Sequence, residues 1–293
     1  MSLLAPVSEA LSAKLGESVH LTPVRSVGGG CINQAQVLRD EQGRSWFLKH
    51  NAQSYAEMFS AEAEGLLELA KARAIRVPTP MVTGEAAGQA YLLMEFLELQ
   101  GRSADAALGE ALAHLHQYRA KQFGWHRDNT IGTTAQLNVW QPDWLVFWRE
   151  QRLQPQLALC ARNGAPASLI SAVEELCECL SAFFTDYQPD PSLLHGDLWG
   201  GNHAVTANGE PVIFDPAVYY GDREADIAMT ELFGGFSEAF YAAYDAVWPR
   251  DPGYAMRRDL YNLYHLLNHF NLFAGSYAQQ AEQMAKRLLA ATR

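Results

Sequence analysis

The chain has few cysteines, no long apolar run and no excess of positive charge. Four cysteines in 293 residues are too few for a disulfide framework, which fits a reducing compartment. No stretch approaches the roughly 18 to 20 apolar residues of a membrane span, and the N-terminus lacks a cationic segment followed by an apolar one. Acidic residues outnumber basic ones by 33 to 22, so nucleic acid and anionic membranes would repel the chain. We therefore expect a cytoplasmic protein with neither partner.

The residues that are present predict an α+β fold. The 48% hydrophobic content is enough for a sizeable core. Residues 3–15 predict a short helix, and residues 24–96 predict strand, strand, helix, strand, with a hairpin around “DEQG”. Later segments are mostly helical. We expect a small mixed N-terminal lobe with an antiparallel sheet, residues 1–97, and a larger, mainly helical C-terminal lobe, residues 98–293, with the boundary near Glu98 to Ser103.

The stretch “LLHGDLWGGN” carries the strongest chemical signal. Asp197 and Asn202 have the D-x-x-x-x-N spacing of a kinase catalytic loop, and Asp215 follows the strand-like “PVIF”. Phosphoryl transfer needs an acid that accepts a proton from a hydroxyl, and an amide and a second acid that hold Mg²⁺. The spacing therefore predicts Asp197 as the base, Asn202 and Asp215 as Mg²⁺ ligands, and a two-lobed protein-kinase-like fold.

Upstream residues supply the nucleotide side of such a site. Lys49 ends the predicted strand “SWFLK”, where a lysine that pairs with phosphates belongs, and Glu62 lies on the following helix, where it can form an ion pair with Lys49. Glu64 is the alternative, but it points about 200° away from Glu62, so only one of them can face Lys49. The run “VGGGCIN” lets backbone N–H groups approach a phosphate at Gly28, Gly29 and Gly30.

His195-Gly196-Asp197, in place of H-R-D, resembles the small-molecule branch of the kinase-like fold, which includes aminoglycoside and choline kinases. A closer similarity, over roughly residues 8–290, is to the fructosamine kinase (ketosamine 3-kinase) family. It rests on “GGGCIN”, “FLKHN”, “MFSAEAEGL”, “VPTP”, “YLLMEFLEL”, “FGWHRDNTIGTTAQLN”, “DWLVFWREQRLQPQL”, “LLHGDLWGGN”, “FDPAVYYGDREADIAMTELFGGF” and “YNLYHLLNHFNLF”.

The resemblance implies ATP-dependent phosphorylation of the 3-hydroxyl of ketosamines, free or bound to protein, as a deglycation repair reaction. It implies that Asp197 orients the 3-hydroxyl and takes its proton, while Asn202 and Asp215 hold Mg²⁺ against the phosphates of ATP. Lys49, oriented by Glu62, would pair with the α- and β-phosphates. Backbone groups of the hinge would contact adenine at Glu95, Phe96 and Leu97.

Each predicted substrate residue has two possible roles. Trp199 either stacks on the sugar or amine or belongs to the core behind the loop. Asp128 and Asn129, in “DNTIG”, either line the acceptor side or fix a turn. We interpret three other groups as structural: the tryptophan stripe, the segment that braces the catalytic loop, and the histidine pair on a late helix, which lacks the acid of H-E-x-x-H. These are Trp140, Trp144 and Trp148; Asp222, Glu224 and Asp226; and His265 and His269.

The cysteines do not predict a metal site. Cys177 and Cys179 are two apart on a predicted helix near 168–184 and point away from each other. Cys31 directly follows the glycine run, so it is either an exposed thiol whose oxidation blocks ATP or links two chains, or a small residue that fits a tight loop. We expect a monomer, with the redox-linked dimer through Cys31 as the alternative.

Two other functions stay open at this point. One is a kinase for another small hydroxylated amine, of the aminoglycoside or choline type, although “DNTIG” with “HGDLW” favours ketosamines. The other is a nucleotide-binding pseudokinase that regulates a partner. The presence of Lys49, Asp197, Asn202 and Asp215 counts against a pseudokinase, which has usually lost at least one of them.

Overall fold

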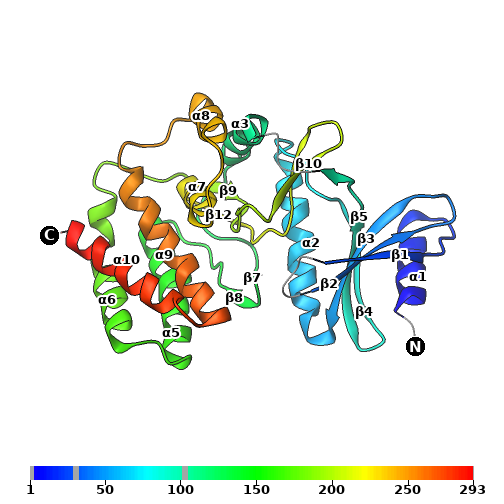
Figure 1. The fold of residues 1–293 in the computed structure, drawn as a ribbon, viewed down its shortest axis with the longest axis horizontal. Helices are drawn as coiled ribbons and strands as arrows, with labels where there is room; N and C mark the ends of the chain where they lie inside the picture. Colours follow the sequence, from blue (N-terminus) through cyan, green and yellow to red (C-terminus); the bar gives the residue numbers. More distant parts are fainter. Residues whose placement is uncertain (1–2, 29–32, 101–104, 293) are drawn as a thin grey trace.

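The structure, a computed structural model, describes residues 3–28, 33–100 and 105–292. The chain forms two lobes side by side, with a sheet in the N-terminal lobe and a bundle of helices in the C-terminal lobe (Figure 1). Helix α2 (Ala56–Lys71) stands between the sheet and the helical lobe.

The N-terminal lobe is built on a five-stranded antiparallel sheet in the order β1-β2-β3-β5-β4. Helix α1 (Leu4–Leu15) packs on one face through Val7 and Leu11, and α2 packs on the other through Phe59 and Leu66. Each face of the sheet is thereby buried. The strands are β1 (Thr22–Val27), β2 (Gln34–Arg39), β3 (Ser45–Ala52), β4 (Pro80–Ala86) and β5 (Gln89–Glu95), with the 3₁₀ turn η1 (Gln53–Tyr55) before α2.

The predicted order of strand, strand, helix, strand is wrong in its count. The hairpin of β2 and β3, the helix and strand β5 are confirmed, but β1 and β4 were not expected. Five of the six residues of β1 are exposed, so this edge strand shows no alternation of apolar and polar residues. β4 begins at Pro80, a residue found in sheets mainly at edges and strand starts.

The C-terminal lobe is mainly helical, as expected. The predicted helix near 168–184 ends earlier, at Glu178, and a 3₁₀ turn follows it. The elements are β6 (Leu99–Gln100), α3 (Asp105–His116), β7 (Asn129–Ile131), β8 (Thr134–Gln136), α4 (Trp144–Phe147), the π-helical turn η2 (Trp148–Leu153), α5 (Gln154–Arg162), α6 (Ala167–Glu178), η3 (Leu180–Phe183), β9 (Ser192–Leu194), β10 (His203–Thr206), β11 (Pro211–Ile213), β12 (Tyr219–Gly221), α7 (Arg223–Leu232), α8 (Glu238–Val247), α9 (Tyr254–Phe273) and α10 (Tyr277–Ala291).

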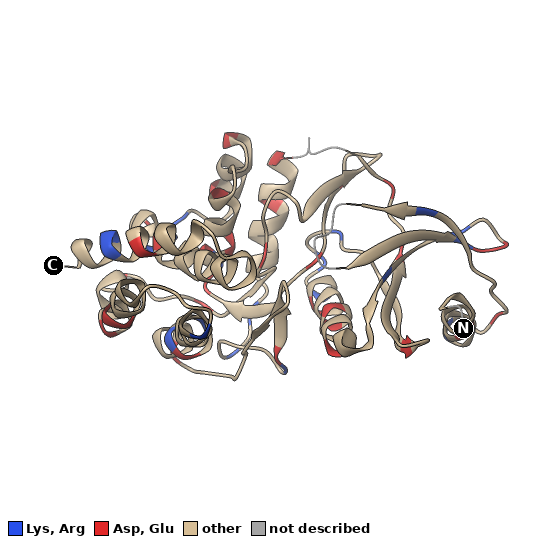
Figure 2. Ribbon diagram, turned by 60° about the horizontal axis from the view of Figure 1, so that its bottom comes forward, with Lys and Arg blue, Asp and Glu red and all other residues tan. Residues whose placement is uncertain are grey.

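Three short sheets in this lobe position the residues of interest. β9 pairs with β12, and β10 pairs with β11 and with β6, the strand that follows the hinge. The division into lobes at residues 97 and 98 stays a prediction. Lysine and arginine positions are dispersed over both lobes in Figure 2 rather than gathered on one element. No helix of residues 3–28, 33–100 and 105–292 is long and apolar enough to span a bilayer.

Candidate active site

The loop between β9 and β10 carries the predicted base. Gly196 has a φ of +83°, and a Cβ there would lie 2.0 Å from the backbone oxygen of Ala217. Only glycine fits this position, because a side chain would meet backbone that has no room to move. The N–H of Ala217 in turn donates to the backbone oxygen of His195 at 2.8 Å. The loop is thus pressed against the segment that follows Asp215.

Asn202 bridges the two predicted acids. Its Nδ2 donates to the backbone oxygen of Asp197 at 2.8 Å and lies 3.3 Å from Asp197 Oδ2 and 3.4 Å from the backbone oxygen of Asp215. The N–H of Phe214 donates to the backbone oxygen of Asn202 at 3.0 Å. Because the amide nitrogen faces the acids, the amide oxygen is left for another ligand.

The electrostatic surroundings of Asp197 disfavour its charged form. Burial raises its pKa well above the usual carboxyl range, and the negative charges of Asp215 and Asp226 raise it further. The hydrogen bond from Asn202 acts in the opposite direction. A carboxylate with a raised pKa is a better proton acceptor than an ordinary one, which suits a general base.

Lys49, on β3, connects the two lobes. Its Nζ lies 2.6 Å from Glu62 Oε1 and also forms an ion pair with the carboxylate of Asp215. Burial lowers the pKa of Lys49, but the charges of Asp215 and Glu62 outweigh burial and raise it, so the ammonium stays charged. Glu64 faces the other way and pairs with His126. Of the two glutamates, Glu62 is the one in contact with Lys49.

Asp215 is well placed for a cation. It is a non-glycine residue at a positive φ of 58°, and its carboxyl group is about half exposed, at 47%. One carboxylate oxygen pairs with Lys49, which leaves the other for a second ligand. Strain of this kind is found at sites where side-chain direction matters.

Asp226, on α7, accepts hydrogen bonds from the loop between β9 and β10, which we call the catalytic loop. Its two oxygens accept the backbone N–H groups of His195 and Gly196 at 2.7 and 2.8 Å, and His116 Nε2 lies 3.2 Å from one of them. Burial raises the pKa of Asp226, but the hydrogen bond from His116, the electrostatic effect of the His116 and His195 rings and the N–H of Gly196 outweigh burial and lower it. The buried carboxylate is therefore charged and fully engaged in bracing the loop.

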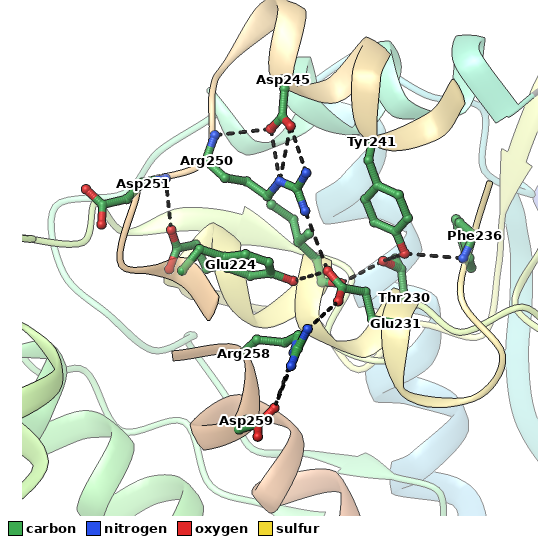
Figure 3. A network of polar contacts seen from close by, with 12 residues as sticks. Glu224, Thr230, Glu231, Phe236, Tyr241, Asp245, Arg250, Asp251, Arg258 and Asp259 are labelled. Carbon is green, nitrogen blue, oxygen red and sulfur yellow. Dashed lines mark hydrogen bonds and ion pairs between the residues drawn. The ribbon is translucent and has the colours of Figure 1, made fainter. Parts of the chain in front are cut away.

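A second polar network, shown in Figure 3, ties the far end of α7 to α8 and α9. Arg250 lies between Asp245, at 2.8 Å, and Glu231, at 3.6 Å. Glu231 also accepts the hydroxyl of Tyr254 at 2.6 Å, and Arg258 reaches it at 3.3 Å. These contacts hold α7, the helix of Asp226, against α9 and the segment between α8 and α9.

The predicted substrate residues are differently placed. Trp199 is 40% exposed and its ring lies over Gly201, so it is not a core residue. Asp128 accepts the N–H of Asn138 at 2.8 Å. Buried Asn129 donates to the backbone oxygen of Val218 at 2.8 Å. These contacts tie “DNTIG”, in which Asn129 begins β7, to Asn138 and to the segment that follows Asp215.

The hinge and the glycine run are only partly described. Glu95 ends β5 and forms an ion pair with Arg76, while its N–H donates to the backbone oxygen of Thr79 at 2.9 Å. Phe96 and Leu97 follow outside any strand. Gly28 directly follows β1; Gly29, Gly30 and Cys31 lie outside the described residues.

Most of the remaining residues that we interpreted as structural are buried, but the interpretation of Trp140 as a core residue is wrong. Cys177 is buried and Cys179 ends α6, each as a free thiol. Trp144 and Trp148 are buried with ring centroids 5.4 Å apart, but Trp140 is 37% exposed and lies outside that core. His265 is buried, and among the described residues no group of three or more His, Cys, Asp or Glu is arranged to hold a metal ion.

Sequence reasoning missed the supporting residues of this site. His116 contacts Asp226, and Gln136 and Asn138 both donate to Asn129 Oδ1, at 2.8 and 2.9 Å. Arg127 was not singled out either, although it pairs with α2. His116 and Arg127 have partners that are distant in sequence, and the contacts of Gln136 and Asn138 with Asn129 follow no regular helix or strand spacing.

Comparison with known proteins identifies relatives over nearly the whole chain. A family model described as fructosamine kinase matches residues 3–291. A probable ketoamine kinase of Synechocystis is 48% identical over 97% of this chain and 96% of its own. A chloroplastic protein-ribulosamine 3-kinase of Arabidopsis thaliana is 44% identical over 91% of this chain and 82% of its own. A crystal structure of a Haemophilus somnus protein assigned provisionally as a fructosamine-3-kinase superposes with a TM-score of 0.87 at 31% identity, covering 97% and 96% of the two chains.

Proposed function

The chain belongs to the fructosamine kinase family, and from this premise we propose that it transfers the γ-phosphoryl group of ATP to the 3-hydroxyl of ketosamines. The protein is an ATP-dependent phosphotransferase of the kinase-like fold that acts on an alcohol group. The observation that carries the proposal is the convergence of Lys49, Asp197, Asn202 and Asp215 from both lobes on one site.

We assign the proton transfer to Asp197. Its partly buried carboxylate, with a raised pKa, accepts the proton of the substrate 3-hydroxyl as the hydroxyl oxygen forms a bond to the γ-phosphorus. The bond from that phosphorus to the bridging oxygen breaks, and ADP takes the electron pair. The products are ADP and the ketosamine 3-phosphate, and the proton stays with Asp197 until it exchanges with solvent.

Asn202 and Asp215 fit a divalent cation, and we propose Mg²⁺. The chain offers one amide oxygen and one half-exposed carboxylate, which are the hard oxygen ligands that Mg²⁺ prefers, and phosphates and water complete its shell in such sites. The bound ion would neutralise charge that develops on the phosphate oxygens. Lys49, charged and held by Glu62, would neutralise more of it on the nucleotide side.

Substrate and nucleotide contacts follow from the exposed groups of the site. We propose that Trp199, two residues after Asp197, stacks on the sugar or amine of the acceptor, because its exposed indole has no core role. The backbone of Glu95, Phe96 and Leu97 would contact adenine, and the glycine run at Gly28 would contact phosphate.

The chemistry of the product gives the reaction its use in deglycation. The C2 carbonyl of the ketosamine acidifies the protons on C1, and loss of one of them gives an enaminol with a C1–C2 double bond. The 3-phosphate is then on the allylic carbon and leaves as inorganic phosphate with the bonding electron pair, and water hydrolyses the resulting imine. Loss of phosphate frees the amine without a further enzyme. The kinase need only phosphorylate, and the one proposed base, Asp197, is enough for that step.

ADP release tests the proposal. The wild-type chain is assayed with Mg-ATP and ribulose-lysine, fructose-lysine, kanamycin or choline, with Asp197→Asn as the inactive variant and Asp190→Asn as the matched control. Asp190 is a half-exposed carboxylate that pairs with Arg119 and is not among the residues assigned to the site. We expect turnover on a ketosamine that Asp197→Asn abolishes and Asp190→Asn preserves. Turnover on kanamycin or choline alone, or ATP binding without any turnover, would contradict the proposal.

A further inference from the structure

One side of α2 carries the glutamate that contacts Lys49, and another side is tied to the C-terminal lobe. Glu57, Ser60, Glu64 and Glu68 recur at intervals of three and four residues, so they line one side of the helix. Glu62 lies about 200° from Glu64, toward the sheet. Anything that rotates or lifts α2 would therefore move Glu62 away from Lys49.

Arg127, from the C-terminal lobe, reaches three side chains on that outer side of α2. Its Nη1 lies 2.5 Å from Glu64 Oε1 and 3.0 Å from Ser60 Oγ, and its Nη2 lies 2.7 Å from Glu57 Oε2. His126 adds a contact of 2.7 Å to Glu64 Oε2. The side chain of Arg127 is only 21% exposed, so it is better shielded from solvent than a free surface arginine. We name these contacts the Arg127 clasp.

The C-terminal lobe fixes the clasp from behind. Asn138 Nδ2 donates to the backbone oxygen of Arg127 at 3.1 Å and to Asn129 Oδ1 at 2.9 Å. Asn129 in turn donates to Val218, in the segment that follows Asp215. The arginine therefore projects from a braced turn and not from a free loop.

Deeper contacts keep α2 close to the same segment. A Cβ at Gly65 would lie 3.2 Å from Val218 Cγ2 and 3.6 Å from Pro216 Cγ, so the helix approaches the chain just after Asp215 as closely as packing allows. One turn further along, Tyr220 donates its hydroxyl to Glu68 at 2.8 Å. The Arg127 clasp and these contacts of Gly65 and Glu68 together set the distance between α2 and Asp215.

We propose that Arg127 is a positioning residue of the nucleotide site: by holding α2 against the C-terminal lobe, it keeps Glu62 on Lys49 without an activating modification or partner. The inference rests on the proposed function for the role of Lys49, and it adds how that site is kept assembled. Control of the corresponding helix is a common means of switching kinases. In this chain, residues of the same chain make the contacts that hold the helix.

The test compares Arg127→Ala with Arg119→Ala, a matched control whose arginine pairs with half-exposed Asp190, not with α2. We measure binding of a non-hydrolysable ATP analogue with Mg²⁺, KM for ATP and for the ketosamine, and hydrogen exchange of α2 amides. Two ion pairs of this exposure predict about fivefold to tenfold weaker nucleotide binding in Arg127→Ala. KM for the ketosamine and the control variant should stay unchanged, α2 amides should exchange faster, and Arg127→Lys should recover part of the loss.

Equal nucleotide affinity in Arg127→Ala, Arg119→Ala and wild type would overturn the proposal, as would a lower melting temperature with unchanged affinity. If Arg127→Ala does not fold, Glu64→Gln removes the charge while keeping the shape, and unchanged affinity in that variant overturns it equally. Binding of the ATP analogue needs no acceptor substrate. If the wild-type chain binds the analogue but does not phosphorylate ketosamines, the proposed function is contradicted, while the proposal for Arg127 can still be tested.

Discussion

The two halves of the site are held by different kinds of contact. Asp226 is 1% exposed and accepts two backbone N–H groups of the catalytic loop, whereas Glu57 and Glu64, which the clasp uses to hold α2, have side chains 91% and 40% exposed. Buried hydrogen bonds to a charged group contribute more free energy than surface ion pairs and are screened less by salt. The loop that carries the proposed base is therefore held more firmly than helix α2, which carries the glutamate in contact with Lys49.

This difference fits the tasks of the two halves. A proton acceptor must lie within hydrogen-bond reach of the reacting hydroxyl, and a displacement of about 1 Å can cost about a hundredfold in rate. A charged lysine acts on phosphate over a longer range, because Coulomb attraction falls off gradually with distance. Changes in the catalytic loop should hence act on kcat, and changes around α2 on nucleotide affinity.

Replacing the proposed base, Asp197, should have the largest effect on activity. A smaller effect would contradict the distinction between the two halves of the site. We expect Asp197→Asn to lower kcat by about a thousandfold, because an amide cannot accept the hydroxyl proton. KM for ATP should change little, since the contacts of Lys49 do not involve Asp197. Steady-state ADP release measures both. A KM for ATP that rises in parallel with the fall in kcat would mean that the loop and the nucleotide side are not separate.

Replacing Lys49, which we propose pairs with the phosphates of ATP, should have the next largest effect on activity. Lys49→Met keeps much of the length of the side chain but leaves Glu62 and Asp215 without their shared cation. We expect kcat/KM for ATP to fall by about a hundredfold. Binding of the ATP analogue, measured by calorimetry, should weaken as well, while KM for the ketosamine stays near its wild-type value. Intact analogue binding would show that Lys49 serves the chemical step alone.

Replacing Asp226, which holds the loop between β9 and β10, should lower the free energy of unfolding by an amount that does not depend on salt. Asp226→Asn keeps the shape but offers one acceptor oxygen where the carboxylate offers two, so either His195 or Gly196 loses the partner of its buried N–H. The expected loss is about 1 to 3 kcal/mol in the free energy of unfolding, measured by urea denaturation. The loss should be the same at low and high NaCl, whereas that of Arg127→Ala should shrink with salt. A salt-dependent loss in Asp226→Asn would contradict the distinction between the two halves.

Much of the fold was predictable because local patterns mark its elements. The apolar spacing of α2, the hairpin of β2 and β3 and the apolar run of β5 each fill a core position, so each has a period in the sequence. β1 lacked such a period because its residues are exposed at the sheet edge. Nor did any pattern indicate that α4 and α5 are joined through a π-helical turn.

Site residues were predictable where spacing encodes a shared loop, and not where partners meet across the fold. Asp197 and Asn202 lie in one loop, and their contact follows from their interval. Sequence favoured Glu62 as the partner of Lys49, with Glu64 as the alternative, and the direction of the α2 side chains shows that Glu62 makes the contact. Arg127 and His116 have partners more than sixty residues away, and one sequence without relatives gives no sign of such pairs.

The cluster of Asp197, Asp215 and Asp226, which makes Asp197 a better proton acceptor, should lower the free energy of unfolding. Burial, with the charges of Asp215 and Asp226, raises the pKa of Asp197 in the folded chain above its value in the unfolded chain. The folded chain therefore binds the proton more tightly, so this group destabilises the fold at pH above its folded pKa. The cost fades as pH falls through that raised pKa and is gone below the ordinary carboxyl pKa.

The smallest predicted effect follows from this sign. Asp197→Asn removes a partly buried negative charge while keeping the shape of the side chain, so it should raise the melting temperature at pH 8 by about 2 °C although it lowers kcat. Scanning calorimetry at pH 8 and pH 4.5 measures the difference, which should shrink at the lower pH as Asp197 of the wild type takes up its proton. Asp190→Asn, at the half-exposed partner of Arg119, should show no such gain. A variant that is less stable than wild type at pH 8 would mean that Asp197 stabilises the loop through its bond to Asn202 by more than its charge destabilises it. In that case the base would be part of the brace, and the loop would be held from two sides rather than from Asp226 alone.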